Sequence, residues 1–133
     1  LESKVILDAV TGLRARQPIF DRTGGVHAAS LLDFDGQVLA TYEDVGRHNA
    51  VDKVVGSQLL AYTLNEPRRL LVVSGRASFE IVQKALSAGI EAVASVSAPS
   101  TLAIDLAREG NLVLAGFVRG ERLVVYSGER RLV

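Results

Sequence analysis

Polar and charged side chains are concentrated between residues 43 and 53, in the segment EDVGRHNAVDK. This segment places Arg47, His48 and Asn49 in succession, flanked by carboxylates. A guanidinium group suits bidentate contact with phosphate, while imidazole and amide groups can hydrogen-bond to phosphate oxygens or to the edge of a base. Apolar residues at helical spacing follow at once, which predicts that these polar groups stand at the start of a buried helix. We interpret them as the lining of a ligand crevice.

Two further polar segments have the same setting. SGRASFE (74–80) and SAPST (97–101) each follow a strand-like run and precede a helical pattern. In open α/β sheets, ligands bind beyond the carboxyl ends of the strands, and the free N–H groups of helix starts favour phosphate. A phosphate-rich ligand is therefore expected, although the chain has neither a Walker lysine loop nor a GxGxxG motif. The residues expected at this rim of the sheet are Asp44, Gly46, Arg47, His48, Asn49, Ser74, Gly75, Arg76, Ser97 and Ser100.

The elements that must position these segments alternate along the chain. A helical pattern over residues 1–13 ends near Gln17-Pro18, and two strand-like runs then flank Asp35-Gly36, a strong hairpin signal. The helix after the hairpin has a predicted inner face made of Ala50, Val51, Val54, Val55, Leu59 and Tyr62. Further runs predict a strand at 69–75, a helix at 78–89, a strand at 91–99, a helix at 100–110 and two strands within 111–127. This order predicts a layered α/β domain with a mixed sheet.

Composition limits the possible functions. The chain has 133 residues, of which 48% are hydrophobic and 23% charged, with 15 basic and 15 acidic side chains. Zero formal net charge argues against broad electrostatic binding to nucleic acid or to a membrane surface. Without cysteine the chain has no disulfide, no thiol chemistry and no cysteine-ligated zinc. We expect one domain over residues 1–133 and, because the chain starts at Leu1 rather than at a methionine, a fragment of a longer protein.

Each polar feature also has a purely structural interpretation. Gly24-Gly25 is compatible with a tight turn, and His27 with a hydrogen-bonded core histidine. Ser78 and Ser100 are suited to cap helices, and so is Asp44. Glu80 and Lys84 are spaced as an i,i+4 surface pair on a helix. The charged residues compatible with solvated surface positions are Asp52, Lys53, Glu80, Lys84, Arg119 and Arg122. The ligand-binding interpretation depends on the convergence of several segments at one rim.

Five segments together resemble the signature blocks of the FdhD/NarQ family of formate dehydrogenase accessory sulfurtransferases: RTGGVHAA, EDVGRHNAVDK, SGRASFEIVQKA, SAPS and LAGFVRGERLVVYS. They occur in order from Arg22 to Ser127, which is most of the chain. The resemblance implies a three-layer α/β/α fold of cytidine-deaminase type, a cytoplasmic homodimer, and binding of the molybdenum bis-guanine-dinucleotide cofactor. It also implies that sulfur passes from a cysteine desulfurase to this cofactor, which activates formate dehydrogenase. A guanine nucleotide such as GDP is the expected surrogate ligand.

The resemblance adds residues to the expected cofactor site. They are Thr23, Gly24, Gly25 and His27 from the first block, and Phe117, Val118, Arg119, Gly120, Glu121 and Arg122 from the last. Members of the family carry sulfur as a persulfide on a Cys-x-x-Cys loop upstream of the matched region, so the resemblance implies that this chain is the C-terminal, cofactor-binding core of such a protein. This chain contains no cysteine, so no catalytic residue is assigned, and we expect the chain alone to be inactive in sulfur transfer.

Two alternative functions follow from the implied fold and from the crevice. A deaminase would have H-x-E and P-C-x-x-C at two successive helix starts. Here His48 is followed by Ala50 where the glutamate would stand, and no cysteine is available, so we expect no protein-bound zinc. The other alternative is a noncatalytic module that binds a nucleotide through the same crevice.

Overall fold

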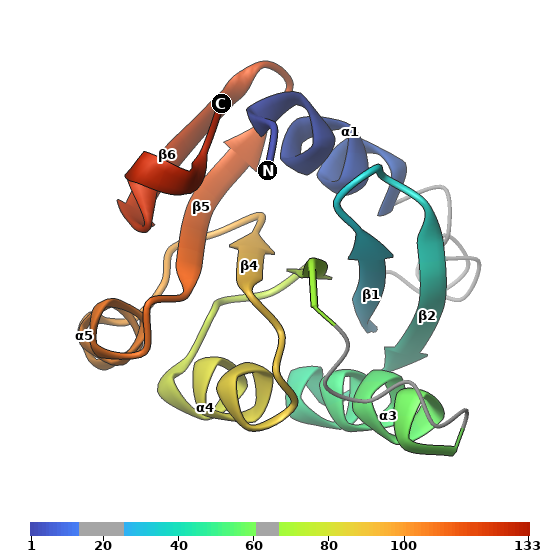
Figure 1. Cartoon of the computed structure of the whole chain (residues 1–133). Coiled ribbons are helices and arrows are strands. Elements are labelled where there is room, and N and C mark those ends of the chain that lie inside the picture. The colour runs from blue at the N-terminus through green and yellow to red at the C-terminus, as the bar shows by residue number, and fades with distance from the viewer. Residues whose placement is uncertain (14–25, 61–66) are drawn as a thin grey trace.

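The computed structural model describes residues 1–13, 26–60 and 67–133. It contains four α-helices and six strands within these ranges (Figure 1). The helices are α1 (Ser3–Leu13), α3 (Arg47–Leu60), α4 (Phe79–Ser87) and α5 (Thr101–Glu109). The strands are β1 (His27–Asp33), β2 (Val38–Asp44), β3 (Arg69–Val73), β4 (Ala92–Ser95), β5 (Val113–Arg119) and β6 (Arg122–Ser127), followed by a short 3-10 helix, η2 (Glu129–Arg131). The element order predicted from the sequence is confirmed.

The six strands form one mixed sheet in the order β2-β1-β3-β4-β5-β6. The pairs β3–β4 and β4–β5 are parallel, whereas β1–β2, β1–β3 and β5–β6 are antiparallel. Strands β2, β3, β4 and β5 therefore all end at the same edge of the sheet. The β1–β2 hairpin turns at Asp35-Gly36 as predicted, and Gly36 takes the left-handed φ of 93° that such a turn requires.

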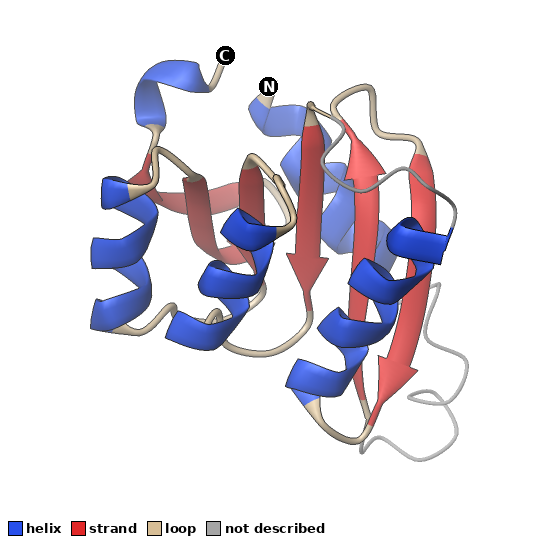
Figure 2. Cartoon of the chain, turned by 60° about the horizontal axis from the view of Figure 1, so that its bottom comes forward, coloured by secondary structure: helices blue, strands red, loops and turns tan. Residues whose placement is uncertain are grey.

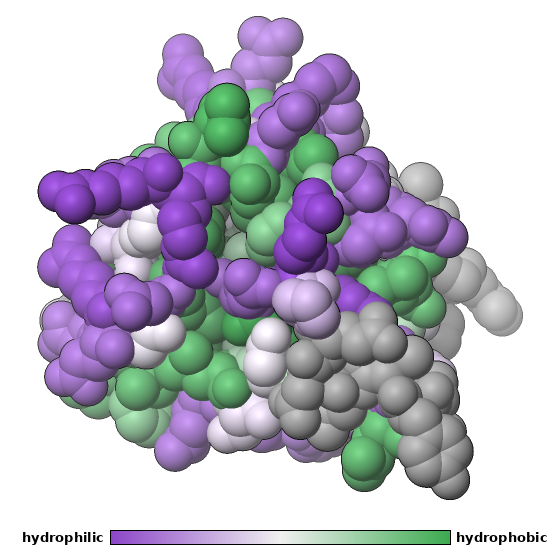
Figure 3. Space-filling model, in the orientation of Figure 1, coloured by the Kyte–Doolittle hydropathy of each residue, from purple (hydrophilic) through white to green (hydrophobic). Residues whose placement is uncertain are grey.

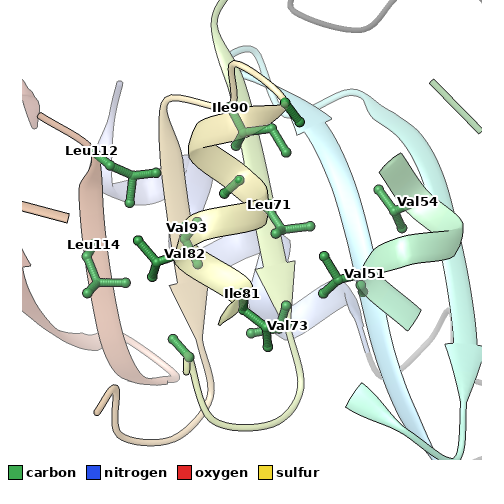
Figure 4. Close-up of a cluster of buried hydrophobic side chains, with 14 of the residues drawn as sticks. Val51, Val54, Leu71, Val73, Ile81, Val82, Ile90, Val93, Leu112 and Leu114 are labelled. Atoms are coloured by element: carbon green, nitrogen blue, oxygen red, sulfur yellow. The ribbon is translucent and has the colours of Figure 1, made fainter. Parts of the chain in front are cut away.

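Helices cover both faces of the sheet and give the predicted α/β/α layers (Figure 2). On one face, α3, α4 and α5 bury a cluster that includes Val51, Leu71, Ile81 and Leu114 (Figure 4). On the other face, α1 packs Ile6 and its neighbours against alternate residues of the same strands. The fully buried run of β3 is what a strand covered on both faces requires. Hydrophilic side chains are most evident over β6 and α5 in the space-filling view (Figure 3).

Two sequence predictions about surface and core are wrong. Leu59 was expected on the inner face of α3 but is 59% exposed, while the neighbouring Gln58 is buried. Gln58 accepts a hydrogen bond from Arg69 of β3, at 3.0 Å, which makes its burial possible. Lys84 forms its ion pair with Asp52 of α3, at 2.7 Å, rather than with Glu80 of its own helix. The predicted positions of Gln17-Pro18 and Tyr62 lie outside the described residues.

Candidate functional site

The polar segments predicted at the strand ends do meet at one edge of the sheet. The ends of β2 and β3 lead into the starts of α3 and α4, and the end of β4 leads into α5. His27 joins them because β1 runs antiparallel and begins where β2 and β3 end. We call this edge the rim; it lies at the bottom of the view in Figure 2.

Asp44 organises the start of α3. Its carboxylate accepts hydrogen bonds from the Gly46 N–H at 3.0 Å and from the Asn49 amide at 3.3 Å, and it pairs with Lys53 at 2.8 Å. The interaction with Lys53, followed by the Gly46 N–H, lowers the pKa of Asp44 from its ordinary 3.8 to about 2. Asp44 therefore stabilises the turn as an anion, and these partners of its carboxylate among the described residues do not include Arg47. The side-chain amide nitrogen of Asn49 is thus already hydrogen-bonded to Asp44.

Arg47, His27 and Gly75 form a corner of the rim. A Cβ atom built on Gly75 would lie 3.1 Å from His27 Nδ1 and 3.6 Å from Arg47 Cδ, so both side chains pass close over the Gly75 backbone. The Arg47 Nε atom is buried and has no hydrogen-bond partner in the part of the chain that the structure describes. A buried, unpaired guanidinium N–H is costly, and an anionic ligand is one way to satisfy it. The corner is therefore suited to hold a phosphate group.

His48 connects the starts of α3 and α4. Its Nε2 atom lies 3.5 Å from the Ser78 hydroxyl, which also caps α4 by accepting a hydrogen bond from the Ile81 N–H. The pKa of Glu80 in the first turn of α4 is lowered, chiefly by a hydrogen bond from its own backbone N–H and by the Ser78 hydroxyl. Electrostatic interactions of Glu80 with His48 and Arg47 contribute less to this shift. Arg76 is exposed beside this group and free to reach a ligand.

The serines at the rim already form hydrogen bonds within the protein, which limits the hydrogen bonds that they can form with a ligand. The Ser74 hydroxyl accepts a hydrogen bond from the Ala28 N–H at 2.9 Å, and the Ser100 hydroxyl caps α5 by accepting from the Ala103 N–H at 3.1 Å. The Ser97 carbonyl accepts hydrogen bonds from the Ser95 hydroxyl and from the Phe117 N–H. The predicted capping roles of Ser78 and Ser100 are thus confirmed.

The β5–β6 hairpin adjoins the rim through this Ser97–Phe117 hydrogen bond, which is 3.2 Å long. Phe117 has a φ of 51°, rare for a residue with a side chain, and lies where the β5–β6 register shifts. Its ring is 50% exposed. A pocket of about 550 Å³ between α1 and the hairpin is lined by Ser3, Leu7, Phe117, Glu121, Arg122, Leu123 and Val124.

The hairpin residues predicted as cofactor contacts are not equivalent. Val118 is 1% exposed and packs in the core beneath α1, so it could meet a ligand only through its backbone. Arg119, Gly120, Glu121 and Arg122 are exposed at the turn, where Gly120 takes a left-handed φ of 54°. Thr23, Gly24 and Gly25 lie outside the described residues.

Two residues that the sequence reasoning missed help to shape the site. Gly116 is needed because a Cβ atom there would lie 2.8 Å from Pro99 Cδ and 3.1 Å from the Ser97 carbonyl oxygen. Lys53 reaches back from α3 to Asp44 and to the Glu43 carbonyl. The Gly116 contact brings together residues far apart in the sequence, and the polar pattern alone could not reveal it.

Comparison with known proteins identifies the family. The model of the FdhD/NarQ family matches residues 1–133. The chain belongs to the FdhD/NarQ family. Curated FdhD relatives named sulfur carrier protein FdhD include one from Streptomyces avermitilis, 54% identical over 132 residues, and one from Picrophilus torridus, 46% identical over 132 residues. These alignments cover 99% of this chain but 47% and 50% of the relatives, so the chain spans about half the length of the curated FdhD proteins it matches.

A solved structure shares the FdhD/NarQ fold of this chain. It is the crystal structure of a protein from Desulfotalea psychrophila described as a formate dehydrogenase accessory protein. The TM-score is 0.88 at 32% sequence identity, over 97% of this chain and 57% of that chain. The predicted α/β fold is thereby confirmed, while the cytidine-deaminase-like classification stays a prediction.

Two kinds of feature are absent from the described residues of this FdhD/NarQ chain: membrane-spanning helices and clusters of metal-ligating side chains. Within residues 1–13, 26–60 and 67–133, none of the helices has the length and apolar character needed to cross a membrane. Over the same ranges, His, Asp and Glu side chains do not gather in groups of three or more that could hold a metal ion. The expectation that the protein binds no zinc stays a prediction.

Proposed function

We propose that this chain is the cofactor-binding core of a sulfur carrier protein that serves formate dehydrogenase. The proposed ligand is the molybdenum bis-guanine-dinucleotide cofactor. Family membership and the names of the curated relatives support the sulfur carrier role. The single structural observation that carries the ligand proposal is the corner in which Arg47, His27 and Gly75 meet, with the buried Arg47 Nε unpaired among the described residues.

The rim and the hairpin divide the proposed contacts between them. Arg47 and Arg76, at the starts of α3 and α4, would bind the diphosphate, helped by the positive ends of these helices. The half-exposed ring of Phe117 offers an apolar face to a guanine or pterin ring, and Arg119 and Arg122 reach outward beside it. The hairpin pocket of about 550 Å³ falls within the size range of small-molecule sites. The molybdenum centre of the bound cofactor supplies the redox chemistry of the client enzyme.

The chain's own part in sulfur transfer is binding and orientation. Sulfur transfer as a persulfide needs a thiol, and this chain contains no cysteine. The thiol would come from the portion of FdhD proteins that this chain does not cover. A cysteine desulfurase as sulfur donor, formate dehydrogenase as recipient, a homodimeric state and a cytoplasmic location belong to the same proposal.

Calorimetric titration of the chain with GDP and with ADP tests the proposed ligand class. A site that recognises guanine should bind GDP more tightly than ADP, since phosphate contacts alone give no preference between bases. Arg76→Ala should weaken GDP binding by about 1.5–3 kcal/mol, the scale of hydrogen bonds to charged groups, with the melting temperature nearly unchanged because Arg76 is exposed.

Arg68→Ala is the matched control for this titration. Arg68 lies just before β3, away from the rim, with its guanidinium 5.8 Å from the centre of the Phe34 ring. Its loss removes the same charge and should leave GDP affinity unchanged. Equal affinities for GDP and ADP, or equal losses in Arg76→Ala and Arg68→Ala, would contradict a guanine-nucleotide site at the rim.

A further inference from the structure

A second polar pocket lies at the opposite edge of the sheet from the rim. It has a volume of about 590 Å³ and is lined by Arg108, Asn111 and residues 127–131. These residues come from the end of α5, the start of β5, the end of β6 and η2. In Figure 2 η2 stands at the top of the molecule, away from the rim at the bottom. We call it the arginine pocket.

Arginine side chains dominate the walls of the arginine pocket. Arg108 donates from Nε to the Tyr126 carbonyl at 3.0 Å, and Arg131 donates to the Asn111 carbonyl. Each guanidinium group thus uses one N–H in a hydrogen bond to a backbone carbonyl, and its other N–H groups stay available for a ligand. Neither these two arginines nor Arg130 forms an ion pair within the described ranges, and Glu129 is the one acidic residue of the lining. The lining therefore carries a formal charge of +2 (three arginines and one glutamate) in a chain of zero net charge.

The wall also contains a serine hydroxyl. Ser127 lines the pocket and is 4% exposed as a residue, and its hydroxyl makes no hydrogen bond with any other described residue. This hydroxyl therefore keeps its hydrogen-bonding capacity for a ligand in the pocket. Gly128 holds the chain against β5 here, with a left-handed φ of 75° and Val113 only 2.8 Å from where a Cβ atom would stand. This close packing fixes the position from which the Ser127 hydroxyl meets the pocket.

We propose that the arginine pocket binds a phosphate group of a small ligand, at a site separate from the rim. Guanidinium groups from α5 and η2 together offer more donors than one carboxylate can accept, whereas a phosphate has enough oxygens for both elements and for the Ser127 hydroxyl. The lining charge of +2 is equal in size and opposite in sign to the charge of a doubly ionised phosphate monoester. The partial negative charge at the carboxyl end of α5, about half a unit, reduces this excess without removing it.

Titration with pyrophosphate, followed by two-dimensional amide NMR spectra of the 133-residue chain, tests the proposal. The amide signals of Asn111 and Gly128 should shift and saturate, while sodium chloride at the same ionic strength should not shift them in this way. The signals of Gly75 and Arg76 report on the rim in the same spectra. A failure of the arginine pocket and a failure of the proposed cofactor site can therefore be distinguished.

Three variants test the residues of the pocket. The double variant Arg108→Ala with Arg131→Ala should weaken the Gly128 response at least roughly tenfold and leave the Gly75 response intact. The Arg130 side chain is exposed and forms no hydrogen bond or ion pair with another described residue, so Arg130→Ala should leave the fold intact and weaken binding by roughly threefold to fivefold, the scale of one exposed charge. Ser127→Ala should lower affinity without lowering the melting temperature, because the hydroxyl has no partner in the described protein.

Arg130→Ala and Ser127→Ala keep the test valid if the double variant does not fold. Parent affinity at the Gly128 signal in these two variants would overturn the proposal. Signals that never saturate, or that sodium chloride shifts equally, would overturn it as well.

Discussion

Gly75→Ala tests whether the corner formed by His27, Arg47 and Gly75 holds the nucleotide. The new Cβ atom would lie 3.1 Å from His27 Nδ1 and 3.6 Å from Arg47 Cδ. Both neighbours are side chains, which can shift by a few tenths of an ångström, and the φ of Gly75 is not in the left-handed region. Crowding destabilises the folded protein, whereas replacing glycine lowers the conformational entropy of the unfolded chain and so stabilises the fold. Because these effects oppose each other, the free energy of unfolding should change by less than about 1 kcal/mol.

The effect on binding should be larger than the effect on stability. Displacing Arg47 from its position removes part of a charge-assisted contact, whose full contribution is about 1.5–3 kcal/mol. Half of that range corresponds to GDP binding that is weaker by roughly threefold to tenfold. Calorimetry measures the affinity, and urea denaturation of the same samples measures the free energy of unfolding.

Gly56→Ala is the matched control for this variant. Gly56 lies within α3, and a Cβ atom there would meet nothing within 4 Å. Alanine should stabilise the helix by about 0.5–1 kcal/mol and leave GDP affinity unchanged. Parent affinity in Gly75→Ala would refute the assignment of the corner to the ligand. A loss of stability well above 1 kcal/mol would refute the reasoning that side chains alone crowd Gly75.

Three further predictions concern the rim and the hairpin. The pKa of Asp44 is lowered to about 2, so its contribution to stability should be complete above about pH 4 and lost as the pH falls towards 2. Urea denaturation measures the free energy of unfolding across this pH range. The loss of this free energy on acidification should be smaller in Asp44→Asn than in the parent protein. The double variant Arg119→Ala with Arg122→Ala should bind GDP roughly tenfold less tightly and with a flatter salt dependence, whereas parent affinity and salt dependence would mean that the turn is only a hairpin. Gly116→Ala should destabilise the fold by about 1–3 kcal/mol in the same denaturation assay, because its Cβ atom would lie 2.8 Å from Pro99 Cδ, and an unchanged midpoint would contradict the close packing seen there.

The order of elements was predictable because the local signals agree. Asp35-Gly36 is a strong local hairpin signal because glycine readily takes the left-handed φ used at this turn, and residues 70–73 of β3 are all apolar because the strand is covered on both faces. The error at Leu59 shows where such signals fail. Helical spacing places Leu59 inside, but the Arg69–Gln58 hydrogen bond buries a polar residue at this end of α3 instead. That pairing joins α3 to β3, and no local pattern contains it.

The candidate site was predictable as a set of segments and less so as a set of contacts. Strand direction brings the polar segments together, and direction follows from the element order. The ion pair of Asp44 with Lys53 and the approach of His48 to Ser78 depend on the angles at which helices leave the strands. The burial of Val118 was not predictable because the register shift between Gly116 and Arg119 interrupts the alternation of inward and outward side chains.

The strained backbone of Phe117 explains how an edge hairpin can contribute to the rim. In a regular strand, a residue between the buried Gly116 and Val118 would project from the opposite face of the sheet. The left-handed φ of Phe117 breaks this alternation, and the hydrogen bond from its N–H to the Ser97 carbonyl fixes the irregular backbone to the loop between β4 and α5. Such strain persists only where surrounding contacts hold it, and the tight packing of Gly116 against Pro99 supplies them. The backbone that carries the aromatic ring is therefore fixed to the loop that begins α5, and the exposure of Phe117 is a property of the fold rather than of a free loop.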